Sequence, residues 1–472
     1  MAGSTQNTEG FPWRLWVVIF SATVIAALLI QLVLLPLVFP TWDSGGGLLD
    51  NCLDCASYHQ IAVRMAADIR QNGWSAWELR PEGHAPAGLA AALYAITVPR
   101  LWTMIPVNAA VHATTVALLF LILTSFGYSC RNATLGAIPF ALFPSSALWY
   151  AQLMKDGFFF LGFFLFLRGW LSVMQSSGQP GRIQAQILAV VEGLSGSLLL
   201  WVIRPEMVKL ILAVSFVVCV AALCMTAGRW KTGRRPLLTG CALTLAASAL
   251  VMGLDRVSAQ TDVHRSVTVP ATVPSVEQRP AAAPDGGKRP LATGSTAAIE
   301  RATAILRTFA SVPARLAGAI IRKRHAFLTE PGAASIDRDV RVETFPELIA
   351  YLPRAARNAF LSPFPWHWFG QGTYASTTSL RRVCGLEMLV VYFALAFVPF
   401  AVWRRRADLF LWAILVYSGG VLVVLGTIVN NWGTLYRLRY GYLMLWVGIG
   451  LCGFLQLAAE LRQRRKLRNQ PS

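Results

Sequence analysis

The chain has 472 residues, of which 55% are hydrophobic and only 14% are charged. Soluble domains carry roughly 25% charged residues, so this composition excludes an ordinary soluble protein. The apolar residues recur in runs of about 20, the length at which a helix crosses the ~30 Å hydrocarbon core of a bilayer. The net charge of +19 is explained by basic cytoplasmic loops. No aromatic-basic module is visible, and we expect no nucleic-acid partner.

Ten apolar runs predict an all-α polytopic membrane protein. The expected transmembrane helices are residues 14–40, 105–127, 132–150, 157–175, 184–203, 206–227, 236–254, 385–403, 409–429 and 440–460. The first run is too long for the apolar part of a signal peptide and lacks a small-residue cleavage site, so we expect it to be retained. A further apolar stretch, 85–103, determines the orientation of every later helix.

The distribution of basic residues resolves this orientation. If 85–103 does not span and the N-terminus is cytoplasmic, the cytoplasmic ends and short loops hold 16 basic residues and the short outer loops hold 5. That is the bias of the positive-inside rule. If 85–103 spans, the basic stretches 229–235 and 404–406 lie outside. We therefore predict a membrane-dipping or interfacial helix at 85–103 on the outer face. Both termini are expected in the cytoplasm, with the chain in a bacterial inner membrane.

This topology divides the chain into three parts. Residues 1–254 form an N-terminal transmembrane module that includes an outer loop, 41–104. Residues 255–384 form an outer, periplasmic segment, and residues 385–472 supply the C-terminal transmembrane helices and a basic cytoplasmic tail.

Within the outer segment, three stretches have distinct compositions. Residues 259–296 are rich in Pro, Ala, Thr and Gly, which predicts disorder. Residues 298–312 have the periodicity of an amphipathic helix lying on the outer leaflet. The sequence PFPWHWF at 363–369 predicts an interfacial aromatic anchor.

Unusual polar residues gather on the predicted outer face. Charged side chains at membrane depth are costly and tend to be functional. The candidate substrate-binding residues are Tyr58, His59, His84, Lys155, Asp156, Arg204, Tyr436, Arg437 and Arg439, and the candidate catalytic residues are Asp43, Asp50 and Asp54. A CxxC at Cys52 and Cys55 has no second pair or histidine cluster to complete a zinc site, so we expect a local disulfide or two free thiols. We expect neither a divalent metal nor another cofactor.

An outward pocket with carboxylates from one loop and cations from others suits the transfer of a sugar from a lipid phosphate. A carboxylate takes the proton of the acceptor hydroxyl as general base. Arginines, here Arg204 and Arg439, neutralise the phosphate that leaves. Structural roles also suit many of these residues: a salt-bridged helix junction (Lys155, Asp156), interfacial anchors (Arg204, Arg439) or turn residues beside a glycine run (Asp43, Asp50).

Four short motifs follow one another on the predicted outer side. They are DCASYHQIA at 54–62, HAPAGL at 84–89, the stretch from Pro-Ser-Ser to Lys-Asp at 144–156, and NWGTLYRLRY at 431–440. In this order they resemble the motifs of GT-C-type membrane glycosyltransferases, a group that includes the protein O-mannosyltransferases and aminoarabinose transferases. The resemblance covers about residues 10–250 and 385–460.

The resemblance implies a GT-C-like bundle of transmembrane helices with membrane-proximal helices on the outer face. It also implies an inverting hexosyl or pentosyl transfer from a polyprenyl-phosphate sugar to a cell-envelope glycan or lipid. The expected partners are thus membrane lipid, this donor and a glycan or glycolipid acceptor. Asp54 lies in the matching motif and is the expected base. The loop lacks the adjacent Asp-Glu pair of the protein mannosyltransferases, which argues against a protein acceptor.

Two other functions remain open. A glycan polymerase or ligase would use a polyprenyl-diphosphate-linked donor, and the outer cations suit that donor as well. The alternative that is not an enzyme is a transporter or flippase. Transporters often show internal repeats and ionisable residues at the bilayer midplane. This sequence shows no repeat, and its unusual residues gather at one face, which disfavours transport.

Overall fold

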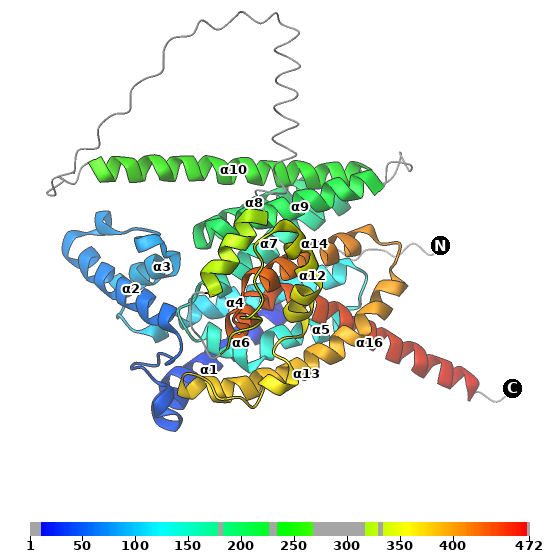
Figure 1. Ribbon diagram of the computed structural model, residues 1–472, viewed down its shortest axis with the longest axis horizontal. Helices are drawn as coiled ribbons and strands as arrows, with labels where there is room; N and C mark the ends of the chain where they lie inside the picture. The colour runs from blue at the N-terminus through cyan, green and yellow to red at the C-terminus, as the bar shows by residue number, and fades with distance from the viewer. Residues whose placement is uncertain (1–10, 178–182, 226–233, 268–316, 329–333, 470–472) are drawn as a thin grey trace, which may run out of the picture.

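The computed structural model describes residues 11–177, 183–225, 234–267, 317–328 and 334–469. These residues are folded into helices, and the only extended pairings among them are two isolated bridges, Asp43 with Leu49 and Ser335 with Asn431. Helices α2 and α3 lie at one end of the molecule, at the left of Figure 1, and the C-terminal end of α16 projects from the opposite end. The all-helical class predicted from the apolar runs is confirmed.

Eight helical stretches in the described part of the chain are long and apolar enough to cross a membrane. They are Trp13–Val38 (α1 and η1), Leu101–Ser125 (η5 and α4), Lys155–Ser176 (α7), Ile183–Ile203 (α8), Leu237–Val257 (within α10), Ala375–Arg404 (α13), Leu409–Ile428 (α14) and Tyr440–Arg468 (α16). The chain is therefore a multi-pass membrane protein, and eight of the ten predicted spans are found.

The two remaining runs differ from the prediction in different ways. The run 132–150 is not one helix, because α5 (Cys130–Leu142) ends before α6 (Pro144–Tyr150) begins. The break is at Phe143, whose backbone is extended (φ −61°, ψ 127°), as the residue before a proline prefers. The run 206–227 does form a helix, α9 (Pro205–Met225), and the last two residues of the run lie outside the described residues.

The first outer loop contains two helices, and the second of them falls within the predicted helix at 85–103. Helix α2 (Leu53–Asn72) packs against α3 (Ala85–Ile96). Helix α3 has 12 residues, a length of about 18 Å, which is too short for the ~30 Å hydrocarbon core. This agrees with the prediction that 85–103 does not span. The short helices beside them are η2 (Pro40–Trp42), η3 (Trp74–Ala76) and η4 (Pro81–Gly83).

The second outer segment is described only in part. Helix α10 (Arg234–Val267) continues past residue 259, so the prediction of disorder is wrong for the first residues of 259–296. The rest of that stretch and the predicted amphipathic helix at 298–312 lie outside the described residues.

Beyond this gap the segment returns to the bundle. Residues 317–328 are helical, and α12 (Phe345–Leu361) packs against α14. The side chains around η6 (Pro365–His367) include Trp366 and Phe369, which are 72% and 75% exposed. The role of this stretch as an interfacial anchor stays a prediction.

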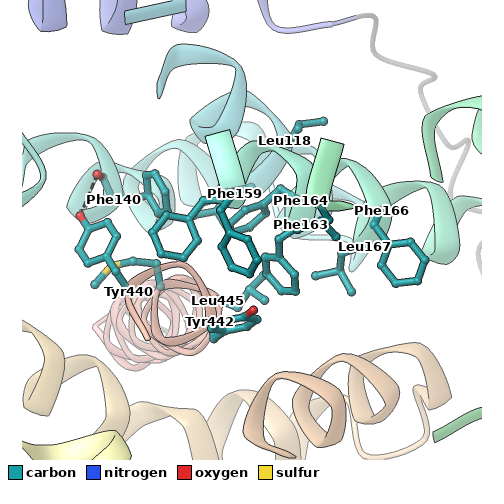
Figure 2. Packing of buried hydrophobic residues seen from close by; sticks show 14 of the residues in the cluster. Leu118, Phe140, Phe159, Phe163, Phe164, Phe166, Leu167, Tyr440, Tyr442 and Leu445 are labelled. Atoms are coloured by element: carbon teal, nitrogen blue, oxygen red, sulfur yellow. Dashed lines mark hydrogen bonds between the residues drawn. The ribbon is translucent and has the colours of Figure 1, made fainter. Parts of the chain in front are cut away.

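Close packing around α7 sets the positions of the helices that carry the candidate residues. Helices α7 and α8 meet at glycines, since a β-carbon at Gly169 or Gly196 would collide with the backbone of the partner helix. Such small residues let helix backbones approach closely in membranes. On another face of α7, Phe163 packs against Tyr442 of α16, with ring centroids 4.5 Å apart (Figure 2). Each aromatic pair of this kind contributes about 0.5–1.5 kcal/mol beyond its buried area.

The predicted orientation in the membrane can be tested by cysteine accessibility. Cysteines introduced at Ser177, after α7, and at Glu82, in the exposed first outer loop, should label from opposite sides of the membrane. We expect an impermeant maleimide applied to intact cells to reach Glu82→Cys but not Ser177→Cys. External labelling of Ser177→Cys alone would show that the topology is inverted.

Candidate functional site

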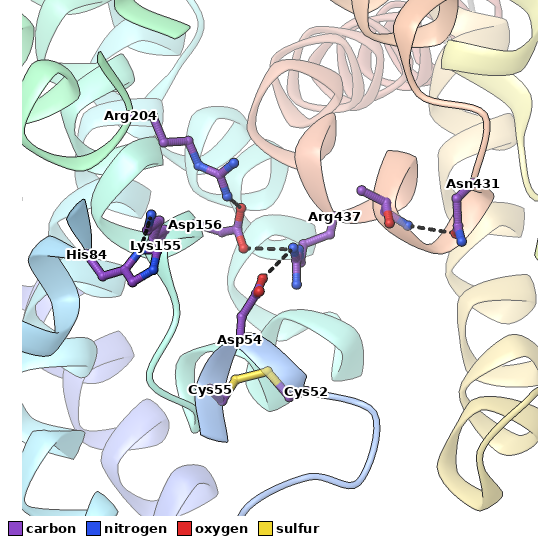
Figure 3. A network of polar contacts seen from close by, with 10 residues as sticks. Cys52, Asp54, Cys55, His84, Lys155, Asp156, Arg204, Asn431 and Arg437 are labelled. Atoms are coloured by element: carbon purple, nitrogen blue, oxygen red, sulfur yellow. Dashed lines mark hydrogen bonds and ion pairs between the residues drawn. A yellow bond between two sulfur atoms is a disulfide. The ribbon is translucent and has the colours of Figure 1, made fainter. Parts of the chain in front are cut away.

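Seven of the predicted residues meet at one end of the bundle, in a group that we call the polar cluster. Its members come from five parts of the chain: Asp54 and Tyr58 from α2, His84 before α3, Lys155 and Asp156 from the start of α7, Arg204 between α8 and α9, and Arg437 from α15 (Trp432–Leu438). Figure 3 shows Asp156 between Arg204 and Arg437, with Asp54 approaching Arg437 from another side.

Asp156 is the buried centre of the cluster. Its Oδ1 lies 2.9 Å from Nη2 of Arg204, and its Oδ2 lies 3.1 Å from Nε of Arg437. The side chain is only 3% exposed, so both ion pairs are largely shielded from solvent. Asp156 also lies in the first turn of α7, where the helix dipole favours an anion. The carboxylate therefore fixes two guanidinium groups that come from opposite halves of the chain.

Asp54 is the accessible carboxylate of the cluster. Its Oδ2 lies 3.4 Å from Nη2 of Arg437, and its side chain is 54% exposed. Burial lowers the pKa of Arg437, but the carboxylates of Asp156 and Asp54 outweigh burial and raise this pKa overall. Arg437 is thus firmly cationic, and Asp54 stands beside it open to an incoming molecule.

Lys155 adds a third cation next to an uncharged pair of rings. Its Nζ donates a hydrogen bond to Nδ1 of His84 at 2.9 Å and lies 5.4 Å from the ring centroid of Tyr58. Burial and then the charge of Lys155 lower the pKa of His84, so the ring is neutral at pH 7 and its Nδ1 accepts. Burial and then Asp54 raise the pKa of Tyr58 to about 12, which keeps its hydroxyl protonated.

The cluster therefore carries a net positive charge. Three cations (Lys155, Arg204 and Arg437) face two carboxylates (Asp54 and Asp156), which leaves one positive charge in excess. Partly buried arginines of this kind suit phosphate, whose oxygens match the guanidinium fork. Among the described residues, no group of three or more His, Cys, Asp and Glu side chains is arranged to hold a metal ion.

The structure does not bring Asp43 or Asp50 into the cluster. Oδ1 of Asp43 accepts hydrogen bonds from the backbone N–H groups of Gly45 and Gly47, at 2.8 and 3.1 Å, as a turn residue does. The carboxylate of Asp50 accepts from the backbone N–H and the hydroxyl of Ser376, in the first turn of α13. Asp43 therefore stabilises its own turn and Asp50 connects the loop to α13, and we retain neither as a candidate base.

Cys52 and Cys55 are joined by a disulfide, which is one of the two states expected for the CxxC. The bridge encloses the first residues of α2, including Asp54 (Figure 3).

His59 points away from the cluster, since its Nδ1 lies 3.0 Å from the hydroxyl of Tyr94 in α3. Burial, followed by the charge of Arg100, lowers the pKa of His59.

Arg439 is also separate from the cluster. It is fully buried, and its guanidinium donates hydrogen bonds to the carbonyl oxygens of Asn358, Ala359 and Ser362 at the end of α12. This placement contradicts its assignment to the donor phosphate, because the fork is already occupied by backbone. Its neighbour Arg437, two residues earlier, lies in the position that was expected of Arg439.

Replacing Arg439 by methionine should therefore destabilise the protein. Each buried carbonyl that loses its donor costs about 1–3 kcal/mol, so we expect a loss of about 3 kcal/mol or more. The lowered melting temperature should be measurable in detergent. Arg382→Gln, which removes an exposed charge from α13, is the matched control and should melt like the wild type. An Arg439→Met variant of unchanged melting temperature would contradict the anchoring role.

A cavity of about 370 Å³ adjoins the cluster and shares Arg437 with it. Its other lining residues are Leu49, Asn51, Cys52, Ser145, Leu148, Trp149, Gln152, Met154, Ala334, Thr373, Tyr374, Thr377, Leu380, Arg381, Cys384, Asn431, Trp432, Gly433, Thr434 and Tyr436. Ligand pockets typically measure about 300–1,000 Å³. Cavity and cluster thus form one continuous candidate site.

Beneath this cavity is a carboxylate that sequence reasoning missed. Glu387 is 4% exposed, and it accepts hydrogen bonds from the backbone and hydroxyl of Ser145, at 2.8 and 2.7 Å, and from the hydroxyl of Tyr436 at 2.5 Å. The hydroxyl of Tyr436 is therefore occupied by Glu387, and Tyr436 contributes to the site only as part of the cavity wall. An ionisable residue inside an apolar run is the signal that would have found Glu387.

Comparisons with known proteins give one structural similarity. No family model matches the sequence, and no curated protein matches it. A solved structure of similar fold is that of the archaeal oligosaccharyltransferase AglB from Archaeoglobus fulgidus, in complex with an inhibitory peptide and a dolichol-phosphate. The TM-score is 0.49 and the sequence identity is 12% over 98% of this chain. The chain spans about half, 52%, of the length of that protein.

Proposed function

We propose that this protein is a membrane glycosyltransferase that moves a sugar from a polyprenyl-phosphate donor to a glycan or lipid acceptor of the cell envelope. The observation that carries the proposal is the polar cluster itself. It combines one accessible carboxylate, Asp54, with a net-positive group of partly buried cations at the end of a transmembrane bundle. The short motifs that resemble GT-C-type glycosyltransferases contribute most of these residues.

The proposed reaction assigns a separate role to each part of the cluster. Arg204, Arg437 and Lys155 bind the phosphate of the donor. The acceptor hydroxyl attacks C1 of the sugar while the bond between C1 and the phosphate oxygen breaks. Asp54 takes the hydroxyl proton as general base, and polyprenyl phosphate leaves with its negative charge stabilised by the arginines. The attack comes from the face of C1 opposite the phosphate, so the configuration inverts.

The long prenyl tail accounts for the membrane setting of the site. A lipid-linked donor stays in the bilayer, and only its phosphate and sugar need to reach the polar cluster. The buried Asp156 holds Arg204 and Arg437 in fixed positions, so the phosphate meets cations that need no rearrangement. Preorganised charge of this kind is usually the largest contribution to catalysis.

Lipid binding and transfer by the purified full-length protein test this proposal. In native mass spectrometry, undecaprenyl phosphate should be retained about tenfold or more strongly than undecaprenol, because only the former offers an anion. Undecaprenyl-phosphate glucose, mannose and aminoarabinose should then be assayed for release of undecaprenyl phosphate in the presence of envelope glycans. Turnover of a diphosphate-linked donor alone would point to the polymerase or ligase function. Equal retention of phosphate and alcohol would contradict the proposal.

A further inference from the structure

The cavity beside the cluster has a composition suited to one class of ligand. Trp149 and Trp432 present aromatic surface to it, and Asn51 contributes an amide group. Aromatic faces pack against the C–H faces of sugar rings, and amides both donate to and accept from hydroxyls. A saccharide presents both kinds of surface in one small molecule, and the cavity volume of about 370 Å³ accommodates one.

A second arginine gives this cavity an anionic preference. Arg381 is only 6% exposed, lines the cavity and lies with its guanidinium carbon 5.0 Å from the ring centroid of Trp432. Trp432 begins α15 and Arg437 lies five residues later, a rise of about 7.5 Å along the helix. The two arginines therefore occupy separate positions in the wall of one cavity. Arginine in a stacked position is a typical partner for a planar carboxylate.

The cavity also adjoins the turn that carries the proposed base, Asp54. Its wall includes Cys52, two residues before Asp54 and in the same disulfide-closed turn. A saccharide hydroxyl at this end of the cavity would lie near the carboxylate that is proposed to take its proton. The donor phosphate, in contrast, is expected among Lys155, Arg204 and Arg437.

The outer segment completes this cavity. Ala334 and Tyr374 belong to its wall, and the backbone around Ser335 pairs with that around Asn431, just before α15. The N–H of Ile336 donates to the carbonyl of Asn430, and that of Trp432 donates to the carbonyl of Ala334. The segment that matches no glycosyltransferase motif is thus built into the wall beside Arg381.

We propose that this cavity binds an acidic saccharide, the acceptor of the transfer reaction, with Arg381 binding its carboxylate. The identification of this saccharide as the acceptor rests on the proposed function, but the preference of the cavity for an acidic saccharide does not require turnover. It gives the cavity one occupant, a uronic-acid residue whose ring lies against the tryptophans. It also assigns the outer segment a part in substrate selection.

Saccharide binding in the absence of any donor tests this proposal. The probes are D-glucuronic acid and D-glucose, added to the purified full-length protein and followed by saturation-transfer NMR. We expect glucuronic acid to bind about tenfold or more tightly than glucose, the scale of a hydrogen bond to a charged group. In Arg381→Gln this preference should fall to about twofold or less.

Two further variants control for structural effects. Arg382→Gln removes the same charge from the next residue, which is exposed, and should keep the wild-type preference. In Gly370→Ala the new methyl group would lie 2.8 Å from Nη1 of Arg381, so it should displace the guanidinium and weaken glucuronic acid binding without removing charge. This variant keeps the test valid if Arg381→Gln fails to fold.

Equal binding of the two probes by the wild type, or no binding of either, would overturn the proposal. A preference that survives Arg381→Gln but disappears in Arg437→Gln would also overturn it, because the acid group would then be bound by the donor-site arginine. Failure of the proposed function has a different signature: undecaprenyl phosphate and undecaprenol would be retained equally, whatever the saccharide preference.

Discussion

Replacing Asp54 by asparagine is expected to reduce sugar transfer about 100-fold or more, the usual scale for loss of a general base. The substitution keeps the size of the side chain and removes its basicity. Because Asp54 is half exposed and Arg437 keeps its contact with Asp156, the fold should be unchanged. Initial rates of polyprenyl phosphate release by wild type and variant provide the measurement.

Donor binding distinguishes this role from simple charge balance. Removing the charge of Asp54 leaves the cluster more positive, so donor phosphate should bind equally well or more tightly in Asp54→Asn. Asp68→Asn removes an exposed carboxylate farther along α2 and should have wild-type turnover. Near-normal turnover in Asp54→Asn would exclude it as the base, and weakened donor binding would indicate a structural role instead.

The second large effect is expected from Arg437, which touches both carboxylates of the cluster. Arg437→Gln should weaken donor binding about tenfold or more, since a charge-assisted contact with phosphate is lost. Turnover should fall further, by about 100- to 1,000-fold, because the charge on the leaving phosphate grows in the transition state. Titration with undecaprenyl phosphate and single-turnover rates measure the two effects separately.

Variants at neighbouring cations sharpen this test. Arg437→Lys should recover only part of the activity, because an ammonium group cannot reproduce the fork that spans Asp156 and phosphate. Arg204→Gln should also weaken donor binding and lower turnover, since Arg204 contacts the other carboxylate oxygen of Asp156. Lys209→Gln, at an exposed residue paired with Asp255, is the matched control. Unchanged donor affinity in both Arg437→Gln and Arg204→Gln would exclude these arginines as the phosphate site.

The sequence by itself determined the class of protein, because hydrophobic length is a local property. A helix needs about 20 apolar residues to cross the bilayer, and each such run is visible without knowledge of its neighbours. Hydrophobic length left 85–103 open, and the distribution of basic residues over the loops predicted that it does not span; α3 is indeed short. Hydrophobic length failed at 132–150, where average hydropathy concealed the break that Pro144 imposes on Phe143.

The candidate site was predictable only in outline. Asp54, Lys155, Asp156, Arg204 and Arg437 could be named as polar residues at the outer ends of helices. Their pairing could not be read from the sequence, since the contact between Asp54 and Arg437 joins residues 383 positions apart. The packing of α7 against α8 and the aromatic contacts between α7 and α16 bring helix ends together that are far apart in the sequence.

Tertiary structure alone separated residues that look equivalent in the sequence. Asp43, Asp50 and Asp54 lie in one loop, yet Asp43 binds the backbone of its own turn, Asp50 binds Ser376 of α13, and only Asp54 faces a cation. Arg437 and Arg439 are two residues apart, but a turn of about 100° per residue along a helix directs them differently. One faces the polar cluster and the other is buried against the end of α12. Sequence patterns place a residue at a helix end, but the neighbours its side chain meets depend on how the helices pack.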